Sequence, residues 1–140
     1  MNTEQKPLGS LSSGLFGGTT VLVTGGGRGI GKQIALAFAR LGAYVVIASR
    51  KPENLNPTAE EIRAIGVECL AVHTNIRETD QVESLVQQAL ECFGTIDFLV
   101  NNAGGQCPAR PAQISDGGWR AVIDLNLNGT WNMSSRAAYG

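Results

Sequence analysis

Apolar residues alternate between two patterns along this chain. Four short runs, at residues 20–23, 43–48, 67–72 and 96–100, are almost continuously apolar. Such runs are typical of strands that are buried on both faces of a parallel sheet. The segments between them repeat apolar residues at helical spacing, and a further segment of this kind begins near residue 115. Strands that alternate with helices predict an α/β fold, specifically a Rossmann-type doubly wound parallel sheet with right-handed crossovers.

Glycine, proline and small polar residues mark the ends of the expected helices. Gly42 and Gly94 follow two amphipathic segments and are expected to end them. A short polar helix is expected between these two, with Pro57 in its first turn. The last helix is expected to be capped by Ser115 or Asp116. Its apolar face is expected to consist of Trp119, Val122 and Ile123.

Composition and charge narrow the class of protein. The 140 residues, 43% of them hydrophobic, are enough for one domain with a core. A net charge of −1 gives no general attraction to nucleic acid or to an anionic membrane. No apolar run approaches the roughly 18 residues that span a bilayer. We expect residues 1–18 to be a flexible lead-in that is not a secretory signal, and residues 19–140 to form the domain.

The cysteines indicate the compartment. The sequence has 3 cysteines, which are far apart and form no Cys-x-x-Cys pair. This pattern favours neither a disulfide framework nor a metal site. We therefore expect a soluble intracellular protein, most simply a cytoplasmic one, and a peroxisomal location stays open.

The stretch Thr24-Gly25-Gly26-Gly27-Arg28-Gly29-Ile30-Gly31 lies between the first expected strand and the first expected helix. A glycine-rich turn at this point lets the backbone approach a pyrophosphate, and the first N–H groups of the helix then face the anion. The strand before it and the helix after it favour this function over a simple chain reversal. We therefore predict a dinucleotide site that includes Gly25, Gly27, Arg28, Gly29, Ile30 and Gly31.

The end of the second expected strand indicates which dinucleotide binds. In many dinucleotide-binding folds an acidic residue here holds the ribose 2′-hydroxyl, but this chain has Ser49, followed by Arg50 and Lys51. Arg28 is a third cation that can face the same pocket, and a guanidinium matches phosphate oxygens well. We therefore predict that Ser49, Arg50 and Lys51 bind the 2′-phosphate of NADP(H). The alternative is that Arg50 and Lys51 form a solvated loop.

Two motifs together resemble the short-chain dehydrogenase/reductase family. Thr24 to Gly31 matches the Thr-Gly-x-x-x-Gly-x-Gly turn of that family, and Asn101-Asn102-Ala103-Gly104, after the fourth expected strand, matches its Asn-Asn-Ala-Gly motif. The resemblance covers the chain from about residue 15 onward. It implies cofactor contacts, at the adenosine ribose and the adenine, from Asn75, Ile76, Asn102, Ala103 and Gly104.

The resemblance also implies a catalytic role for Asn126, which matches the Asn of the family's Asn-Ser-Tyr-Lys set and kinks its helix there; Asn128 is a competitor. The family's Tyr-x-x-x-Lys pair, which exchanges a proton with the substrate, has no counterpart, because the lysines are Lys6, Lys32 and Lys51. We therefore expect the amino-terminal β-α-β-α-β-α-β-α portion of such an enzyme, truncated before that pair and inactive alone.

Within the family, residues 45–51, 75–77, 98–102 and 104–106 resemble peroxisomal trans-2-enoyl-CoA reductases. The resemblance implies an NADP(H)-dependent oxidoreductase that transfers hydride to or from a carbonyl, an alcohol or an enoyl-CoA. It also implies a small-molecule substrate, with acyl-CoA among the candidates, and a homodimer or homotetramer for the full-length form. Neither a nucleic acid nor a membrane is expected as a partner. Two alternatives stay open: a dinucleotide-binding module without catalysis, and an inert fragment.

Overall fold

A computed structural model describes residues 9–139 of the chain. Within them, four parallel strands form one sheet in the order β3-β2-β1-β4. The strands are β1 (Thr20–Thr24), β2 (Tyr44–Ser49), β3 (Cys69–His73) and β4 (Phe98–Val100). The helices that connect them are α1 (Gly29–Arg40), α2 (Pro52–Ile65) and α3 (Thr79–Phe93). The predicted α/β fold with a doubly wound parallel sheet is therefore confirmed.

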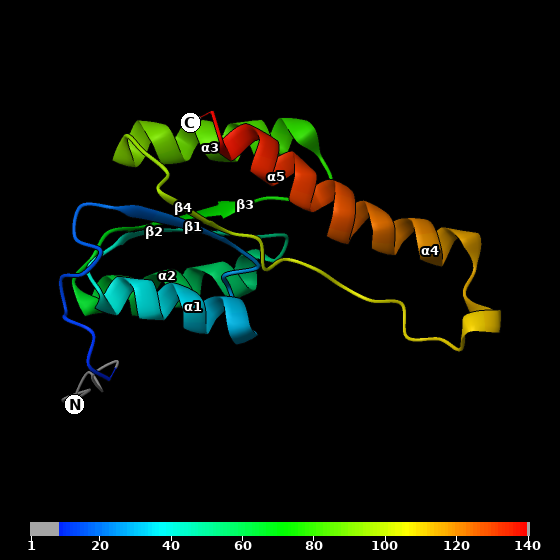
Figure 1. Ribbon diagram of the computed structural model, residues 1–140, viewed down its shortest axis with the longest axis horizontal. Coiled ribbons are helices and arrows are strands. Elements are labelled where there is room, and N and C mark those ends of the chain that lie inside the picture. Colours follow the sequence, from blue (N-terminus) through cyan, green and yellow to red (C-terminus); the bar gives the residue numbers. More distant parts are fainter. Residues whose placement is uncertain (1–8, 140) are drawn as a thin grey trace.

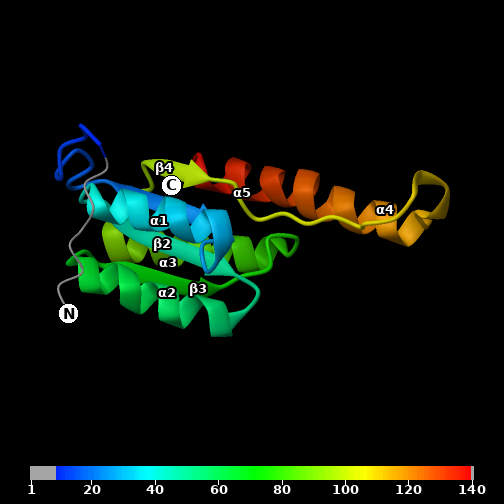
Figure 2. The same cartoon turned by 90° about the horizontal axis from the view of Figure 1, so that it is seen from below.

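The molecule has three layers. Helices α1 and α2 cover one face of the sheet, and α3 covers the other together with α5 (Gly129–Ala137) (Figures 1 and 2). Because successive side chains of a strand point to opposite faces, Val21 and Val23 of β1 pack toward α1 and α2, whereas Leu22 packs toward α3 and α5. All three are fully buried. Each face of the sheet therefore has its own apolar core.

The two outer strands are less covered than their apolar sequences predicted. All of β1 and the four middle residues of β2 are buried, as expected. In β3 only Cys69 is buried, and in β4 no residue is, with Phe98 36% exposed. Both strands lie at an edge of the sheet and have one neighbouring strand each. An apolar run does not reveal whether a strand is flanked on both sides, so the expectation was wrong for these two strands.

Helix α2 begins earlier than expected. It starts at Pro52, and Pro57 lies inside the helix instead of in its first turn. A proline at the first helical position loses no hydrogen bond, because that N–H has no partner within the helix. Pro52 therefore sets the start, and the helix tolerates the one backbone bond that Pro57 cannot form. Gly94 ends α3 with a φ of 81°, as predicted.

The last helical segment starts as predicted but does not bury its expected apolar face. The Oγ of Ser115 accepts a hydrogen bond of 3.0 Å from the backbone N of Gly118 and caps α4 (Asp116–Ile123). No residue of α4 is buried, and Trp119 is 60% exposed. Figures 1 and 2 show the reason: α4 and the long loop before it extend away from the layered body. The described residues therefore leave Trp119, Val122 and Ile123 without full cover.

The expected lead-in, residues 1–18, is only partly described, since residues 1–8 lie outside the described part. Residues 9–18 form turns and contact the domain. The backbone N of Phe16 donates to the carbonyl of Leu41 at 2.9 Å, and its ring stacks on Phe38 with centroids 5.0 Å apart. None of the helices in residues 9–139 has the length and apolar character that a membrane crossing requires.

Candidate functional site

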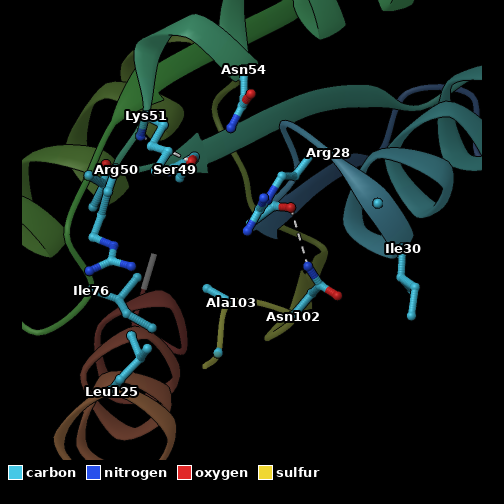
Figure 3. A pocket seen from close by; sticks show the side chains of 15 residues that line it. Arg28, Ile30, Ser49, Arg50, Lys51, Asn54, Ile76, Asn102, Ala103 and Leu125 are labelled. Atoms are coloured by element: carbon cyan, nitrogen blue, oxygen red, sulfur yellow. Dashed lines mark hydrogen bonds between the residues drawn. The ribbon is translucent and has the colours of Figure 1, made fainter. Parts of the chain in front are cut away.

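A cleft of about 440 Å³ opens at the carboxyl ends of β1 and β2, beside the start of α1 (Figure 3). On one side of β1 lie β2 and β3, and on the other side lies β4, so the strand order reverses at this point. Open α/β sheets bind their ligands in the crevice at such a reversal. The cleft is lined by Gly25, Arg28, Gly29, Ile30, Ala48, Ser49, Arg50, Lys51, Asn54, Thr74, Ile76, Asn102, Ala103, Gly104 and Leu125.

Backbone atoms form much of the wall where the glycine-rich turn lies. Gly25 and Gly29 have φ values of 66° and 56°, in the left-handed region that glycine adopts without strain. Both line the cleft, together with Arg28 and Ile30.

Two further glycines of the motif, Gly27 and Gly31, do not line the cleft but pack behind it. A Cβ on Gly31 would overlap the carbonyl oxygen of Gly25 and the side-chain Nδ2 of Asn102. A Cβ on Gly27 would lie 3.0 Å from the Cβ of Asn54 in α2. These two positions therefore allow the turn to pack closely against its neighbours.

Asn102 attaches the glycine-rich turn to the end of β4. Its Nδ2 donates to the carbonyls of Thr24 and Gly25, at 3.1 and 3.3 Å. In the other direction, Thr24 Oγ1 accepts hydrogen bonds from the backbone N of Asn102 at 3.1 Å and of Ala103 at 3.0 Å. Asn101 instead contacts α5, where its Nδ2 donates to Ser134 Oγ at 3.1 Å. The predicted residues Asn102, Ala103 and Gly104 all line the cleft.

Three cations line the cleft, as Figure 3 shows: Arg28 in the glycine-rich turn, and Arg50 and Lys51 after β2. Ser49 lies beside them, and its Oγ accepts a hydrogen bond of 3.2 Å from the backbone N of Lys51. The lining residues described here include no acidic side chain. The three ion pairs found within residues 9–139 involve other cations. The cleft is therefore electrostatically suited to an anion.

Ile76 lines the far side of the cleft and is held by α5. It is 5% exposed, and Gly129 packs so closely that a Cβ there would lie 2.6 Å from Ile76 Cδ1. Asn132 Nδ2 donates to the carbonyl of Ile76 at 3.0 Å. The neighbouring Asn75 does not line the cleft. Its Oδ1 accepts hydrogen bonds from the backbone N and the Nε of Arg77, at 3.2 and 3.3 Å.

Four of the lining residues were not predicted from the sequence: Ala48, Thr74, Asn54 and Leu125. Ala48 and Thr74 lie at the carboxyl ends of β2 and β3, and that position alone could have identified them. Asn54 and Leu125 reach the cleft from helical segments. No local sequence pattern distinguishes them, because their place depends on how those segments pack.

Asn126 lies beside the cleft, next to Leu125, in a π-helical turn (Asp124–Asn128) between α4 and α5. Its side chain is fixed at both ends: Oδ1 accepts from Gly105 N at 3.2 Å, and Nδ2 donates to the carbonyls of Gly105 and Val122, both at 2.8 Å. Its own carbonyl accepts a hydrogen bond of 2.8 Å from Thr130 Oγ1. The polar interruption of the apolar pattern thus coincides with a local irregularity of the helix.

The competing candidate, Asn128, lies at the end of the same turn. Its Nδ2 donates to Asp124 Oδ1 at 3.1 Å, one helical turn away. This contact stays within the helical segment, whereas Asn126 connects the segment to the loop after β4.

The donor groups of the cleft determine what it can bind. Guanidinium, ammonium and backbone N–H groups gather at the glycine-rich turn and the end of β2, and Ile76 and Ala103 contribute apolar atoms to the lining. Residues 9–139 contain no group of three His, Cys, Asp or Glu side chains that could hold a metal ion. The arrangement suits a ligand with phosphate groups and a flat apolar part.

Comparisons with known proteins agree with this geometry. The family model described as short chain dehydrogenase matches residues 19–139. The probable 2,4-dienoyl-CoA reductase of Bacillus subtilis (strain 168) is 36% identical over 120 residues, which cover 84% of this chain and 46% of that protein.

Solved structures give the same result. The citronellol catabolism dehydrogenase of Pseudomonas aeruginosa PAO1 superposes with a TM-score of 0.86 at 42% identity, covering 91% of this chain and 52% of that one. An actinorhodin polyketide ketoreductase solved with NADPH gives a TM-score of 0.82 at 34% identity, covering 85% of this chain and 46% of that one. The chain spans about half the length of the proteins it matches.

Proposed function

This chain belongs to the short chain dehydrogenase family, and on that premise we propose that it forms the cofactor-binding part of an NADP(H)-dependent oxidoreductase. Members of this family are oxidoreductases that bind a nicotinamide dinucleotide. The observation that carries the proposal is the cleft at the strand-order reversal, in which a glycine-rich turn and three cations face the same space.

The residues of the cleft fit such a cofactor. The amides at the start of α1, which begins at Gly29, are proposed to hold the pyrophosphate. Gly25 and Gly29 carry no side chain and adopt positive φ, so the backbone is open to the ligand, and the helix dipole favours an anion. Ile30, 75% exposed at the cleft, is proposed to contact the cofactor beside them. Gly27 and Gly31 act from behind by allowing the close packing of the turn.

The adenosine half is proposed to lie against the residues that follow β3 and β4. Asn102, Ala103 and Gly104 face the space for the ribose, and buried Ile76 offers an apolar surface for the adenine. Asn75 is proposed to accept a hydrogen bond from the adenine amino group through its Oδ1, after a side-chain rotation that releases Arg77.

The preference for NADP(H) over NAD(H) is proposed from Ser49, Arg50, Lys51 and Arg28. A 2′-phosphate adds about two negative charges to the ribose, and guanidinium groups without an acidic neighbour attract it. The experiment compares the dissociation constants of NADPH and NADH for the wild type and for Arg50→Glu by nicotinamide fluorescence. We expect the variant to lose about tenfold or more in NADPH affinity, with a smaller change for NADH.

Arg110→Glu is the matched control, because Arg110 is exposed and does not line the cleft. It carries the same change of charge and should leave the NADPH affinity within about twofold of the wild type, since exposed charges at a distance are largely screened. Equal NADPH affinity in wild type and Arg50→Glu would refute the phosphate role.

When bound, the nicotinamide supplies or accepts a hydride at its C4 atom. The chain's own contribution is to orient the bound cofactor. Asn126 is proposed to belong to the catalytic set, because its side chain fixes Gly105 beside the cleft and its carbonyl lies in the π-helical turn. The tyrosine and lysine that exchange the proton are proposed to lie in the part of the family's length that this chain does not span, so that the chain alone binds cofactor without turnover.

The substrate class is proposed to be a CoA thioester with a double bond or carbonyl near the thioester. The support is the resemblance of several segments to enoyl-CoA reductases and the similarity to a probable 2,4-dienoyl-CoA reductase. A protein that carries this chain within the full family length should oxidise NADPH faster with a trans-2-enoyl-CoA than with the free acid. Equal rates would contradict the thioester preference.

A second candidate function is a dinucleotide-binding module without catalysis, because the residues that line the cleft all fit the binding of a cofactor. If a protein that carries this chain within the full family length turns over substrate and this chain alone does not, the enzymatic function is supported. Cofactor binding without turnover in both supports the module.

Assembly into a homodimer or homotetramer is proposed through the segment from α4 to α5. Trp119, Leu127 and Trp131 are 60%, 62% and 68% exposed and follow one another along this segment. Exposed apolar side chains in a row are typical of an association surface. An intracellular compartment is proposed from the free cysteines, of which Cys92 and Cys107 are exposed.

A further inference from the structure

Asn54 is a cleft residue that the dinucleotide-binding motifs do not explain. It lies in the first turn of α2, is half-buried and lines the cleft. Figure 3 shows its side-chain amide pointing into the cleft, with no hydrogen bond to any of the other residues drawn. A polar group in this position is available to a ligand.

Helix α2 holds Asn54 at a fixed place relative to the glycine-rich turn. The Oγ1 of Thr58, one turn further along α2 and 1% exposed, donates to the carbonyl of Gly27 at 2.9 Å. Gly27 itself packs against Asn54, where a Cβ would lie only 3.0 Å from the Asn54 Cβ. A third link is the ion pair between Lys32 Nζ of α1 and Glu61 Oε1 of α2, at 2.7 Å.

A buried hydrogen bond resists separation, because breaking it would leave Thr58 and Gly27 unpaired. The first turn of α2 and the glycine-rich turn therefore form one unit. Asn54 enters the cleft at the side where Arg28 and Lys51 also lie.

The chemistry of an amide in this place is informative. An asparagine amide has an NH₂ group that donates to phosphate oxygens and an oxygen that accepts from a hydroxyl, whereas a carboxylate only accepts. A carboxylate beside Arg28 and Lys51 would neutralise the cations and repel a phosphate. An amide keeps the positive potential of this side of the cleft intact.

On these grounds, and resting on the proposed function, we infer that Asn54 is a specificity-determining residue that donates from its side-chain amide to the 2′-phosphate of NADP(H). It supplements Arg28, Arg50 and Lys51 from a different element of the fold. Helix α2 thus takes part in cofactor selection as one wall of the phosphate subsite.

The experiment measures the dissociation constants of NADPH and NADH, by nicotinamide fluorescence, for the wild type, Asn54→Asp and Asn54→Lys. We expect Asn54→Asp to weaken the binding of NADPH at least about tenfold and to leave the affinity for NADH unchanged or higher. Asn54→Lys should shift the ratio of the two dissociation constants in the opposite direction, in favour of NADPH. A variant that simply misfolds would lose both cofactors together and could not produce the two opposite shifts.

Asn56→Asp is the matched control: it makes the same substitution two residues away on α2, at an exposed position that does not line the cleft. If Asn56→Asp weakens the binding of NADPH as much as Asn54→Asp does, the effect comes from the added negative charge anywhere on α2, and the inference is wrong. The inference is also wrong if both Asn54 variants keep the wild-type preference while Arg50→Glu loses it. If the wild type binds neither cofactor, the proposed function fails as well.

Discussion

At Gly31 the surrounding structure leaves no room for a side chain. It is the last glycine of the turn, and a Cβ there would overlap the carbonyl of Gly25 and the amide of Asn102. We expect Gly31→Ala to lower the free energy of unfolding by about 1–3 kcal/mol, because the overlap falls on backbone that has to shift. NADPH binding should weaken along with it. Chemical denaturation and a fluorescence titration measure the two effects.

Gly14→Ala is the control for this prediction, because nothing lies within 4 Å of a Cβ at that position. Its unfolding free energy should stay within about 0.5 kcal/mol of the wild type. A Gly31→Ala protein as stable as Gly14→Ala would show that the turn is not packed as described.

The cysteines provide a second test at single positions. Burial of Cys69, which is 7% exposed, raises the pKa of its thiol from 9.0 to about 11, whereas Cys92 and Cys107 are exposed. The thiolate is the reactive form, so at pH 8 a thiol reagent should label two cysteines in the folded protein and the third only after unfolding.

The same pKa shift predicts a pH dependence of stability. Because the folded pKa lies above the unfolded one, the contribution of the Cys69 thiol is complete below about pH 9 and is lost as the pH rises through about 11. Cys69→Ala should therefore lose less stability than the wild type between these two pH values. Rapid labelling of all three thiols in the folded state would contradict the burial of Cys69.

At the level of elements, Thr24 shows how two strands share the construction of the cleft. Its Oγ1 accepts hydrogen bonds from the backbone N of Asn102 and of Ala103, and so joins β1 to the segment after β4. We expect Thr24→Val to lower the free energy of unfolding by about 1–3 kcal/mol, because the N–H of Ala103 loses its partner and the N–H of Asn102 keeps only the carbonyl of Val100.

Thr24→Ser keeps the hydroxyl and is the matched control. It should recover most of the lost stability and all of the NADPH affinity, both measured as for Gly31. A Thr24→Val protein that unfolds like Thr24→Ser would mean that water satisfies the N–H of Ala103 equally well.

The elements also show how far sequence reasoning reaches. The strands, the turn and the capping by Ser115 were predictable, because each follows from spacing or from local backbone chemistry. The positions of Asn54 and Leu125 were not, since they depend on how helical segments pack against the turn. The partial burial of β3 and β4 was missed for a related reason: apolar spacing does not encode the number of neighbours.

The cleft likewise contains residues that the sequence could predict and residues that it could not. The two motifs, the end of β2 and the family resemblance together led to most of the residues that line the cleft, including Arg28, Arg50 and Asn102. They also led to Gly31 and Asn75, which the structure places outside the lining. A motif specifies which residues a turn or strand end requires, and only the fold separates those that face the ligand from those that hold the turn in place.

At the scale of the whole molecule, a layered body carries an extended segment that it does not bury. Two apolar cores lie against the faces of the sheet, while α4 contributes no buried residue and leaves the body (Figure 1). The Ser115 cap and the backbone hydrogen bonds of the helix stabilise α4. Because α4 continues through the π-helical turn into α5, it is the uncovered end of a longer helix, and it can fray from Asp116 without loss of a buried contact.

Hydrogen exchange therefore separates two states of this segment. In dilute solution, the amides of α4 should exchange at least about a hundredfold faster than those of β1 and β2, because local opening of α4 breaks no core contact. At higher concentration their protection should rise, since Trp119, Leu127 and Trp131 are exposed along the proposed association surface. Trp119→Glu should abolish this dependence on concentration and leave the exchange of β1 unchanged. Slow exchange of α4 in a protein that light scattering shows to be monomeric would contradict this prediction, because the uncovered end of the helix would then be stable without a partner.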